Sequence, residues 1–490
     1  MSKSYITEDD IEQDLLDKLS SKYAYNIIKC DPSVDKREEL NDGTGRTKKT
    51  QCILPIILKN KLKELNKGVS DEILDSYFNS LSQNIGNADL VEKNYNIYKS
   101  IRESKTINFS YKGKEDFTQI TLIDFNDVSK NDITVVSQMW IQGNYGQWRR
   151  PDVLIFVNGM PLVFIELKNA TVKIKQAYEK NLKSYINDVP NLFVFNQICV
   201  LSNGIETRLG AFNTTYDYFF EWLRLNEKDK VDRNKIYNEG TSIEYLINGL
   251  LGRENLLDYV ENFILFERKT TKILAKNHQF LGVNNLYENI LNRDKLNGKL
   301  GVFWHTQGSG KSFSMVMLTR KVRRKIEGNF TFLIVPDRDD LDGQIYKNFV
   351  RTEVIGDKEE VQPKNSEKLR GFLKSNKNFI FTLIHKFRPE KKGKRYSVLS
   401  ERNDIIVLVD EAHRTQYKDL AENMRVGLPN ANFVAFTGTP LLGSKRLTNQ
   451  WFGNYVSEYN FSQSVEDGST VPIFYSRRVP EAWLQNGLFR

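Results

Sequence analysis

Three polar side chains at the ends of two apolar segments have the types and spacing of a metal-dependent nuclease site. Asp152 precedes one apolar segment, and Glu166 and Lys168 end the next. Hydrolysis of a phosphodiester with Mg²⁺ requires carboxylates that hold the metal and a cation that orients or activates the attacking water. Glu166 and Lys168 are two residues apart, so on a strand their side chains project from the same face. We therefore predict that Asp152, Glu166 and Lys168 are catalytic and that both carboxylates are metal ligands.

The turn between the two apolar segments decides whether Asp152 can reach Glu166. A two-residue Asn158-Gly159 loop would pair residue 152 with residue 165 and leave the two carboxylates on opposite faces. A three-residue loop over 158–160, or a β-bulge, would instead pair residue 152 with residue 166. The nuclease hypothesis requires this second arrangement, and the alternative is a hairpin that merely has polar ends.

Basic and aromatic side chains come just before Asp152. Arg149 and Arg150 follow the interleaved aromatic residues Trp140, Tyr145 and Trp148. Arginines beside stacking aromatic rings suit contact with a phosphate backbone, so the two arginines are candidate DNA contacts. Tryptophans in the core with solvated arginines explain the same pattern about as well.

A second chemistry, phosphate binding, is indicated by a glycine-rich segment further along the chain. The predicted nucleotide contacts are Thr306, Gln307, Gly308, Ser309, Gly310, Lys311 and Ser312. Glycines let backbone N–H groups point at phosphate oxygens, the lysine adds positive charge, and the serine hydroxyl can bind Mg²⁺. ATP and Mg²⁺ are therefore the predicted cofactors, with Ser312 as one metal ligand.

Acidic and hydroxyl residues at the ends of two later apolar segments complete the predicted ATP site. One segment ends in Asp-Glu-Ala-His over 410–413, and the next in Phe-Thr-Gly-Thr-Pro over 436–440. Asp410 can hold Mg²⁺ through water, and Glu411 can polarise the attacking water. A glycine turn beside an acidic surface patch is the alternative. The residues expected to couple hydrolysis to movement are His413, Thr437 and Thr439.

The elements that must position these residues belong to two α/β units. The spacing predicts a first helix over 7–20 and an exposed polar loop over 31–50. Strands are predicted at 119–125, 133–140, 152–157, 161–167 and 192–201, with a lysine-rich helix near 172–187. From 256 onward strands alternate with helices, which is the rhythm of a parallel sheet of RecA type. The predicted domains are a PD-(D/E)xK-type nuclease domain with its N-terminal helix over 1–255, a first RecA-like ATPase/helicase lobe over 256–470, and the start of a truncated segment over 471–490, with the second lobe absent.

Composition agrees with a protein that binds a polyanion. The 490 residues include 71 Lys and Arg against 62 Asp and Glu, a formal net charge of +9. This excess is a weak indication of a nucleic-acid partner. Three widely spaced cysteines suggest neither a disulfide framework nor a zinc site, so a reducing cytoplasm is expected. The acidic start resembles no signal peptide, and no apolar run approaches the ~20 residues that span a bilayer, so no membrane association is expected.

Taken together, these motifs resemble the R (restriction, motor) subunit of type I restriction-modification enzymes. The resemblance rests on Pro151-Asp152, Glu166-Leu-Lys168, Leu201-Ser-Asn-Gly204, Trp304-His-Thr-Gln-Gly-Ser-Gly-Lys-Ser312 and Val409-Asp-Glu-Ala-His-Arg414. It implies a bacterial subunit that pumps double-stranded DNA with ATP and cleaves unmethylated DNA away from the recognition site. It also implies partner subunits for methylation and specificity, and a role for Gln279 in reading adenine.

The sequence departs from the family pattern in two places. The family motif Gln-x-x-x-Tyr ends at Tyr185, a candidate DNA contact, but Asn181 stands where glutamine is expected. The family's chains are also about twice as long, and their ATP sites rely on an arginine from a second lobe. Two alternatives therefore remain, a nuclease-helicase of DNA repair and an inactive DNA- or ATP-binding fragment.

Overall fold

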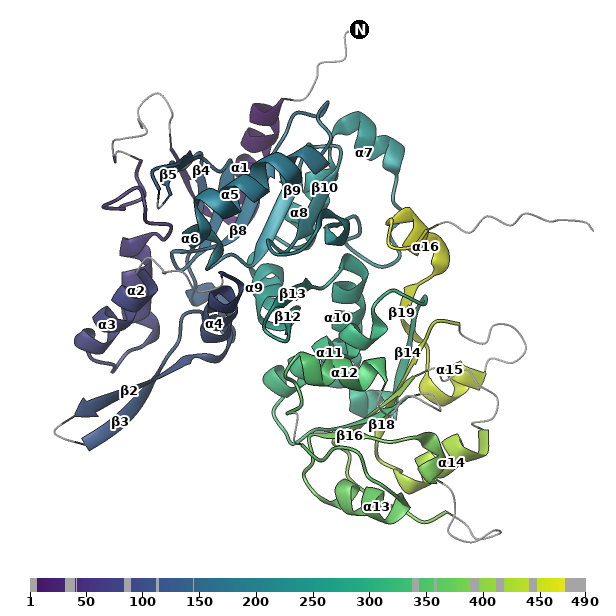
Figure 1. The fold of residues 1–490 in the computed structure, drawn as a ribbon. Coiled ribbons are helices and arrows are strands. Elements are labelled where there is room, and N and C mark those ends of the chain that lie inside the picture. The colour runs from purple at the N-terminus through teal and green to yellow at the C-terminus, as the bar shows by residue number, and fades with distance from the viewer. Residues whose placement is uncertain are drawn as a thin grey trace, which may run out of the picture.

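Two sheets, one in each half of the molecule, organise the computed structural model (Figure 1). The described residues are 7–30, 40, 42–82, 90–111, 114–143, 145–336, 343–356, 359–387, 396–410, 418–439 and 447–471. Two of the predicted site residues, Glu411 and His413, lie outside these ranges. Within them, no helix is both long enough and apolar enough to cross a lipid bilayer.

The N-terminal half is built on a mixed seven-stranded sheet in the order β1-β4-β7-β8-β9-β10-β11. Its strands are β1 (Asn26–Lys29), β4 (Ile133–Ser137), β7 (Val153–Val157), β8 (Met160–Leu167), β9 (Ile198–Ser202), β10 (Thr207–Gly210) and β11 (Phe220–Glu221). Strands β7, β8 and β9 are buried along their whole length. The central strands therefore lie between two apolar layers, and polar groups on them are shielded from solvent.

A bulge between β7 and β8 sets the register that the nuclease hypothesis needs. Val157 pairs with Met160 across the Asn158-Gly159 turn, but the register shifts between Ile155 and Phe156. Beyond the shift, Val153 lies opposite Ile165. One step further, this register places residue 152 opposite residue 166. Of the two arrangements considered from the sequence, the bulge is the one that forms.

Helices and small hairpins surround this sheet. They are α1 (Glu8–Tyr23), α2 (Pro55–Leu65), α3 (Asp71–Ser82), α4 (Leu90–Glu103), α5 (Lys183–Asp188), α6 (Pro190–Phe193), α7 (Arg233–Glu239), α8 (Ser242–Gly249), the antiparallel pairs β2 (Lys105–Tyr111) with β3 (Lys114–Ile120) and β5 (Ile141–Gln142) with β6 (Trp148–Arg149), and 3-10 turns at Val128–Lys130 and Tyr216–Tyr218. A π-helix over Ala177–Leu182 runs directly into α5. The capping box of Thr7 and Asp10 starts α1 as predicted.

Two predicted strands in this half are misplaced, and one predicted loop is exposed only in part. The strand expected at 119–125 is β3, which ends at Ile120. The stretch 192–201 is not one strand, because α6 occupies its first residues and β9 begins only at Ile198. The described part of 31–50 is a loop that is exposed only in part: Leu40 is 42% exposed, whereas Asp42 and Arg46 are 6% and 5% exposed. The Arg46 guanidinium pairs with the Asp42 carboxylate at 2.6 Å and donates to the Trp140 carbonyl at 3.0 Å. These contacts satisfy the charges internally, which sequence polarity alone does not reveal.

The C-terminal half is built on a six-stranded, fully parallel sheet in the order β16-β15-β17-β18-β14-β19. Its strands are β14 (Lys299–His305), β15 (Thr331–Val335), β16 (Phe379–Phe381), β17 (Ile405–Asp410), β18 (Asn432–Thr437) and β19 (Tyr455–Tyr459). Its helices are α10 (Asn277–Leu291), α11 (Lys311–Lys325), α12 (Gln344–Arg351), α13 (Ser366–Lys374), α14 (Lys418–Gly427), α15 (Leu447–Phe452) and α16 (Phe461–Glu466), with 3-10 turns at Arg293–Leu296 and Ile384–Phe387. The sequence predicted this parallel sheet, and the carboxyl ends of its strands meet at one edge.

Helix α9 (Arg253–Asn262) and the hairpin of β12 (Ile264–Glu267) with β13 (Thr271–Leu274) lie between the two sheets (Figure 1). The helix spans the boundary expected at residues 255 and 256. One hydrophobic cluster contains buried side chains of both halves, for example Ile155 from β7 and Phe332 from β15. The two halves therefore share a core.

Candidate nuclease and nucleotide sites

Asp152 and Glu166 come together at the end of the β7–β8 pair. The bulge aligns the two positions, and the Asp152 carboxylate turns toward β8, where its Oδ2 accepts a hydrogen bond from the N–H of Leu167 at 2.7 Å. Glu166 is buried within β8, at 2% exposed. The structure thus places both predicted carboxylates at one point of the sheet.

Burial and mutual repulsion disfavour the ionised form of these two carboxyl groups. Burial, together with the neighbouring Asp152 carboxylate, raises the pKa of Glu166 to about 8. Burial likewise raises the pKa of Asp152 above its usual range. Among the described residues, Glu166 Oε2 is buried and has no hydrogen-bond partner. A cation placed there would satisfy this oxygen and favour the ionised carboxylates.

Lys168 supplies part of that charge. Its Nζ lies 2.9 Å from Glu166 Oε1 and donates to the Leu167 carbonyl at 2.5 Å. Burial disfavours its ammonium form, but the carboxylates of Glu166, Asp152 and Glu8 outweigh that effect and raise the pKa of Lys168. The lysine is therefore protonated at neutral pH and lies on the same face as Glu166, as predicted.

The donors present fit a divalent ion that keeps part of its water shell. Within the described residues, no three His, Cys, Asp or Glu side chains converge as a complete metal site. Mg²⁺ commonly binds through one or two carboxylates and completes its shell with water and substrate phosphate oxygens. Asp152 and Glu166 provide such a partial set, and the unpaired Glu166 Oε2 is its open position.

Helix α1 brings to this site two further acidic residues, Glu8 and Glu12, which are not among the site residues predicted from the sequence. Glu8 Oε1 accepts from the N–H of Asn169 at 3.2 Å and lies 3.8 Å from Lys168 Nζ. One turn later, Glu12 accepts from the Gln138 side-chain amide, whose Nε2 also lies 3.5 Å from Asp152 Oδ1. The signal in the sequence was the spacing of Glu8 and Glu12, one helical turn apart on one face of α1.

Asn181 contacts the candidate catalytic carboxylate directly. Its Nδ2 donates to Glu166 Oε1 at 2.5 Å, from within the π-helix. Four residues later, the buried Tyr185 donates its hydroxyl proton to the Arg150 carbonyl at 2.7 Å. Asn181 therefore holds one Glu166 oxygen, and Tyr185 fixes the backbone just before Asp152. Contact of Tyr185 with DNA stays a prediction.

The two candidate DNA-binding arginines lie beside this site. Arg149 pairs with the carboxylate of Asp188 at the end of α5. The Arg150 guanidinium lies over the Trp140 ring, 5.1 Å from its centroid. Cation–π stacking of this kind holds a guanidinium in place while leaving its N–H groups available. Their contact with DNA stays a prediction.

The glycine-rich loop connects β14 to α11 as predicted. Gly308 and Gly310 adopt the left-handed φ values of 79° and 86°, and α11 begins at Lys311. The Lys311 Nζ donates to the His305 carbonyl at 3.0 Å and so folds back over the loop. A chain that turns this way at a helix N-terminus is a phosphate-binding geometry.

The hydroxyl groups of the loop have defined neighbours. Ser309 Oγ donates to the Thr306 carbonyl at 2.6 Å. The Asn348 side-chain amide of α12 donates to Ser312 Oγ at 2.9 Å. Asn348 fixes the predicted Mg²⁺ ligand, and sequence reasoning missed it because no local pattern links residues 36 positions apart.

Strand register brings the other predicted ATP-site residues to the same sheet edge. Trp304 pairs with Thr437, and Asp410 pairs with Phe436. A Cβ atom on Gly438 would lie 3.4 Å from Lys311 Nζ, so the segment leading to Thr439 passes close to the loop. Asp410, Thr437 and Thr439 thus lie near the phosphate loop, while their roles in catalysis and coupling stay predictions.

Gln279 lies directly against the phosphate loop. Its Nε2 donates to the Gly310 carbonyl at 3.0 Å, and its Oε1 accepts from the N–H of Lys276 at 2.9 Å. Its amide thus links the start of α10 to the loop. The part that Gln279 plays in reading adenine stays a prediction.

Two buried histidines, His278 and His305, lie next to the phosphate loop. His278 Nε2 lies 2.9 Å from the Ser309 carbonyl, and its ring stacks on Tyr459 with centroids 3.8 Å apart. Burial lowers the pKa of His278 to about 3 and that of His305 well below its usual range. Both are therefore neutral at physiological pH, and the neutral His278 donates to the Ser309 carbonyl.

Two family models and several curated relatives match this chain. A family model described as "Type I restriction enzyme R protein N terminus" matches residues 5–218, and one described as "SWI2/SNF2 ATPase" matches 278–488. The type I restriction enzyme HindI endonuclease subunit of Haemophilus influenzae is 36% identical over 96% of this chain and 46% of its own length. The SauMSSORF170P endonuclease subunit of Staphylococcus aureus is 23% identical over 73% of this chain and 38% of its own.

Among solved structures, the UvsW helicase of bacteriophage T4 covers 42% of this chain and 67% of its own, with 13% identity and a TM-score of 0.30. At this TM-score the likeness adds nothing to the assignment of a family. The chain spans about half the length of the curated relatives it matches.

Proposed function

Because this chain belongs to the family of R subunits of type I restriction enzymes, we propose that it cleaves double-stranded DNA and drives its translocation with ATP. In this proposal the seven-stranded sheet is a PD-(D/E)xK-type nuclease domain and the six-stranded sheet is the first lobe of a RecA-like motor. The names of its relatives favour this role over a DNA-repair nuclease-helicase.

The β7–β8 bulge carries the nuclease proposal, because it alone aligns Asp152 with Glu166. When bound, Mg²⁺ would stabilise the negative charge that develops on the scissile phosphate. Asp152 and Glu166 would hold the ion, and Asn181 would keep one Glu166 oxygen in place. Lys168 would hold the attacking water or the phosphate through its ammonium group, which the carboxylates keep protonated.

The phosphate loop and its neighbours support the motor proposal. Amides of the loop and Lys311 would bind the phosphates of ATP, and Ser312 and Asp410 would bind Mg²⁺. In the assembled enzyme, methylation and specificity subunits would recognise the DNA site. Glu411 would polarise the attacking water, and His413 would take part in coupling.

Substitution of the nuclease residues tests whether cleavage and motor activity are separable. In the full-length subunit assembled with its partner subunits, Asp152→Ala, Glu166→Ala and Lys168→Ala should each reduce DNA cleavage by at least about 10²-fold, since each removes a metal ligand or the positioned cation. ATP turnover should stay within about twofold of wild type. Cleavage is measured on a circular plasmid and turnover by phosphate release.

Two control variants complete this experiment. Glu179→Ala removes an exposed carboxylate of the π-helix that contains Asn181 and should leave cleavage unchanged. Lys311→Ala should abolish nucleotide binding by calorimetry and, with it, both turnover and cleavage. Cleavage that persists in the three nuclease variants would move the active site elsewhere in the complex.

A further inference from the structure

A strongly basic pocket lies between the two halves of the molecule, away from both candidate active sites. Its volume is about 310 Å³, and it is lined on one side by α4 and on the other by the C-terminal half of α11. Five of its lining side chains are basic and two are acidic; the basic ones are Lys99, Arg102, Arg320, Arg323 and Arg324. We call it the basic pocket.

The position of the basic pocket separates it from the ATP site. The phosphate loop leads into α11 at Lys311, whereas the pocket begins nine residues later, at Arg320. At 1.5 Å per residue, the phosphate loop and the start of the basic pocket are about 13 Å apart along α11. None of the predicted nuclease or nucleotide residues lines the pocket. The basic pocket is therefore a separate feature.

Acidic side chains balance only part of the positive charge in the basic pocket, since two of its lining residues are acidic and five are basic. Arg320 is 8% exposed, and within the described part of the chain the hydrogen bond of its guanidinium is the one from Nη1 to the Ile264 carbonyl, at 3.4 Å. Arg324 donates to the Glu261 carbonyl at 2.7 Å and to Asn262 Oδ1 at 3.1 Å, which are neutral oxygens. Burial, and then the nearby Arg102, lowers the pKa of Arg324 to about 10. Buried guanidinium groups that repel one another favour an anion between them.

Arg102 has an unused donor in this pocket. Its side chain is 13% exposed and lies over the Tyr98 ring, 5.2 Å from the centroid, with the Glu103 carboxylate beside it. Its Nε is buried and has no hydrogen-bond partner within the described residues. A buried N–H group without a partner costs about 1–3 kcal/mol, so an acceptor that enters the pocket would gain this bond.

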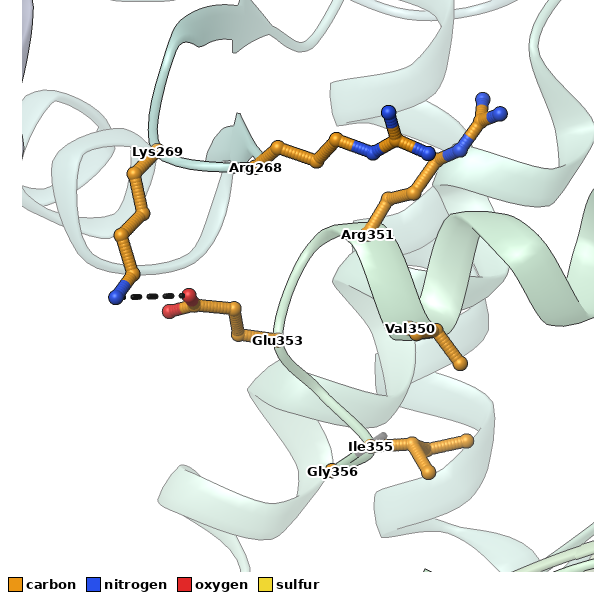
Figure 2. A pocket seen from close by; sticks show the side chains of 7 residues that line it. All are labelled: Arg268, Lys269, Val350, Arg351, Glu353, Ile355 and Gly356. Atoms are coloured by element: carbon orange, nitrogen blue, oxygen red, sulfur yellow. Dashed lines mark ion pairs between the residues drawn. The ribbon is translucent and has the colours of Figure 1, made fainter. Parts of the chain in front are cut away.

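A second pocket continues the basic surface. Its volume is about 650 Å³, and it lies between the β12–β13 turn and the end of α12 (Figure 2). We call it the hairpin pocket. Arg268 and Arg351 extend their guanidinium groups toward the same region in Figure 2, and the N–H of Arg268 donates to the Arg351 carbonyl at 2.8 Å. Glu353 lines both pockets, so they adjoin.

The acidic residue that lines the hairpin pocket, Glu353, is already engaged. Glu353 lies 3.5 Å from Lys269 Nζ and accepts a hydrogen bond from the Tyr95 hydroxyl. Arg351 pairs with Glu267 at 3.0 Å. Arg268 and Lys269 have left-handed φ values of 50° and 62°, which cost side-chain-bearing residues about 1 kcal/mol or more each. The turn thus displays two cations at a strained position.

We propose that the basic pocket and the hairpin pocket together bind consecutive phosphate groups of a DNA backbone. Arginines arranged along two adjoining pockets match a linear polyphosphate better than a single anion, because each guanidinium can bind one phosphate. Both halves of the molecule supply the cations, so the bound strand would bridge the nuclease and motor halves. This inference rests on the proposed action on DNA, but not on cleavage.

The salt dependence of DNA binding tests the inference on the intact chain. The variant Lys99→Gln/Arg323→Gln removes two exposed cations of the basic pocket and should weaken binding of a labelled duplex, measured by fluorescence anisotropy without Mg²⁺. Each lost phosphate contact lowers the slope of log K against log salt by about 0.9, so a loss of about 2 is expected. Arg268→Gln/Lys269→Gln should have a similar effect through the hairpin pocket.

A control variant and a second ligand, pyrophosphate, distinguish the possible outcomes. Lys67→Gln/Lys295→Gln, which removes two exposed lysines that line neither pocket, should leave the slope unchanged. Pyrophosphate should raise the unfolding temperature of wild type more than that of Arg102→Gln. Stabilisation by pyrophosphate that Arg102→Gln removes, with an unchanged DNA slope, would assign the basic pocket to a free polyphosphate and overturn the DNA assignment. Unchanged slopes in both pocket variants, with equal stabilisation of wild type and Arg102→Gln by pyrophosphate, would refute the inference.

The same data separate this inference from the proposed function. If wild type binds duplex DNA and the pocket variants bind it equally well, only the pocket assignment fails. If wild type binds no DNA at all, the proposed action on DNA fails, whatever pyrophosphate does.

Discussion

Glu227 shows how a single partly buried carboxyl connects the two halves of the molecule. It lies between β11 and α7, and its Oε2 accepts from the N–H of Glu458 at 3.1 Å, next to β14 in the six-stranded sheet. Its other oxygen accepts from Ser457 Oγ, which lies 2.6 Å from His305 Nε2 at the base of the phosphate loop. Burial raises the pKa of Glu227 to about 7. The carboxyl is thus half-protonated near neutral pH.

This raised pKa predicts a specific pH dependence of stability. Between the unfolded pKa near 4.5 and the folded pKa near 7, the native state binds more protons than the unfolded state, so the free energy of unfolding should fall as pH rises. A shift of this size corresponds to on the order of 3 kcal/mol. Glu227→Gln, which mimics the neutral form, should flatten this part of the profile in urea titrations at pH 4.5 to 8.

Glu166→Gln is the comparison variant for this prediction, because the pKa of Glu166 is also raised, to about 8. Its effect should extend to higher pH than that of Glu227→Gln. A Glu227→Gln profile that is parallel to wild type would mean that the Glu227 carboxyl titrates alike in the folded and unfolded states.

At the scale of elements, the β12–β13 hairpin is tied to the N-terminal half by a buried lysine. Lys272 is 1% exposed, and its Nζ donates to Asn196 O and Gln197 Oε1, each at 2.7 Å, and to Asn94 Oδ1 at 3.1 Å. These acceptors are neutral, and burial lowers the pKa of Lys272 well below its usual range. The hairpin is therefore anchored by hydrogen bonds and not by an ion pair.

Lys272→Met should destabilise the protein by about 2–4 kcal/mol. The substitution keeps the apolar stem but takes the lysine donor from Asn94 Oδ1 and Gln197 Oε1, while the Asn196 carbonyl keeps its hydrogen bond from Asn94 Nδ2. Each buried acceptor left unsatisfied carries a desolvation cost. Lys269→Met, an exposed position in the same hairpin, should change stability by less than about 0.5 kcal/mol. Chemical denaturation measures both, and equal effects of the two variants would contradict the anchoring role.

Sequence patterns predicted the elements that carry the two sites better than the details that align them. The phosphate loop and the parallel strands have strong local signals, and they form where expected. The β7–β8 turn was ambiguous because both registers bury apolar residues on strands that are covered on both faces. The π-helix that aims Asn181 at Glu166 has no local signal, since it depends on packing against β8.

At the scale of the whole molecule, the shared core implies that the two halves unfold together. The same hydrophobic cluster includes Leu16 and Val135 near the seven-stranded sheet, and Phe303 and Val434 in the six-stranded sheet. Arg224, on the N-terminal side, also pairs with Glu466 at 2.9 Å and with Asp467 at 2.5 Å. Separating the halves would expose this apolar surface and break the charge pairs of the buried Arg224, which favours a single cooperative transition.

Nucleotide binding to the motor half should therefore stabilise the nuclease half as well. A ligand present at 100 times its dissociation constant adds about 2.7 kcal/mol to the free energy of unfolding of the cooperative unit that contains its binding site. Calorimetry of residues 1–490 should show one transition that moves upward with an ATP analogue, and hydrogen exchange should slow in Val153–Val157 of β7 as well as in β14. Lys311→Ala should remove both effects. Protection confined to the six-stranded sheet would mean that the halves unfold independently, in spite of their common core.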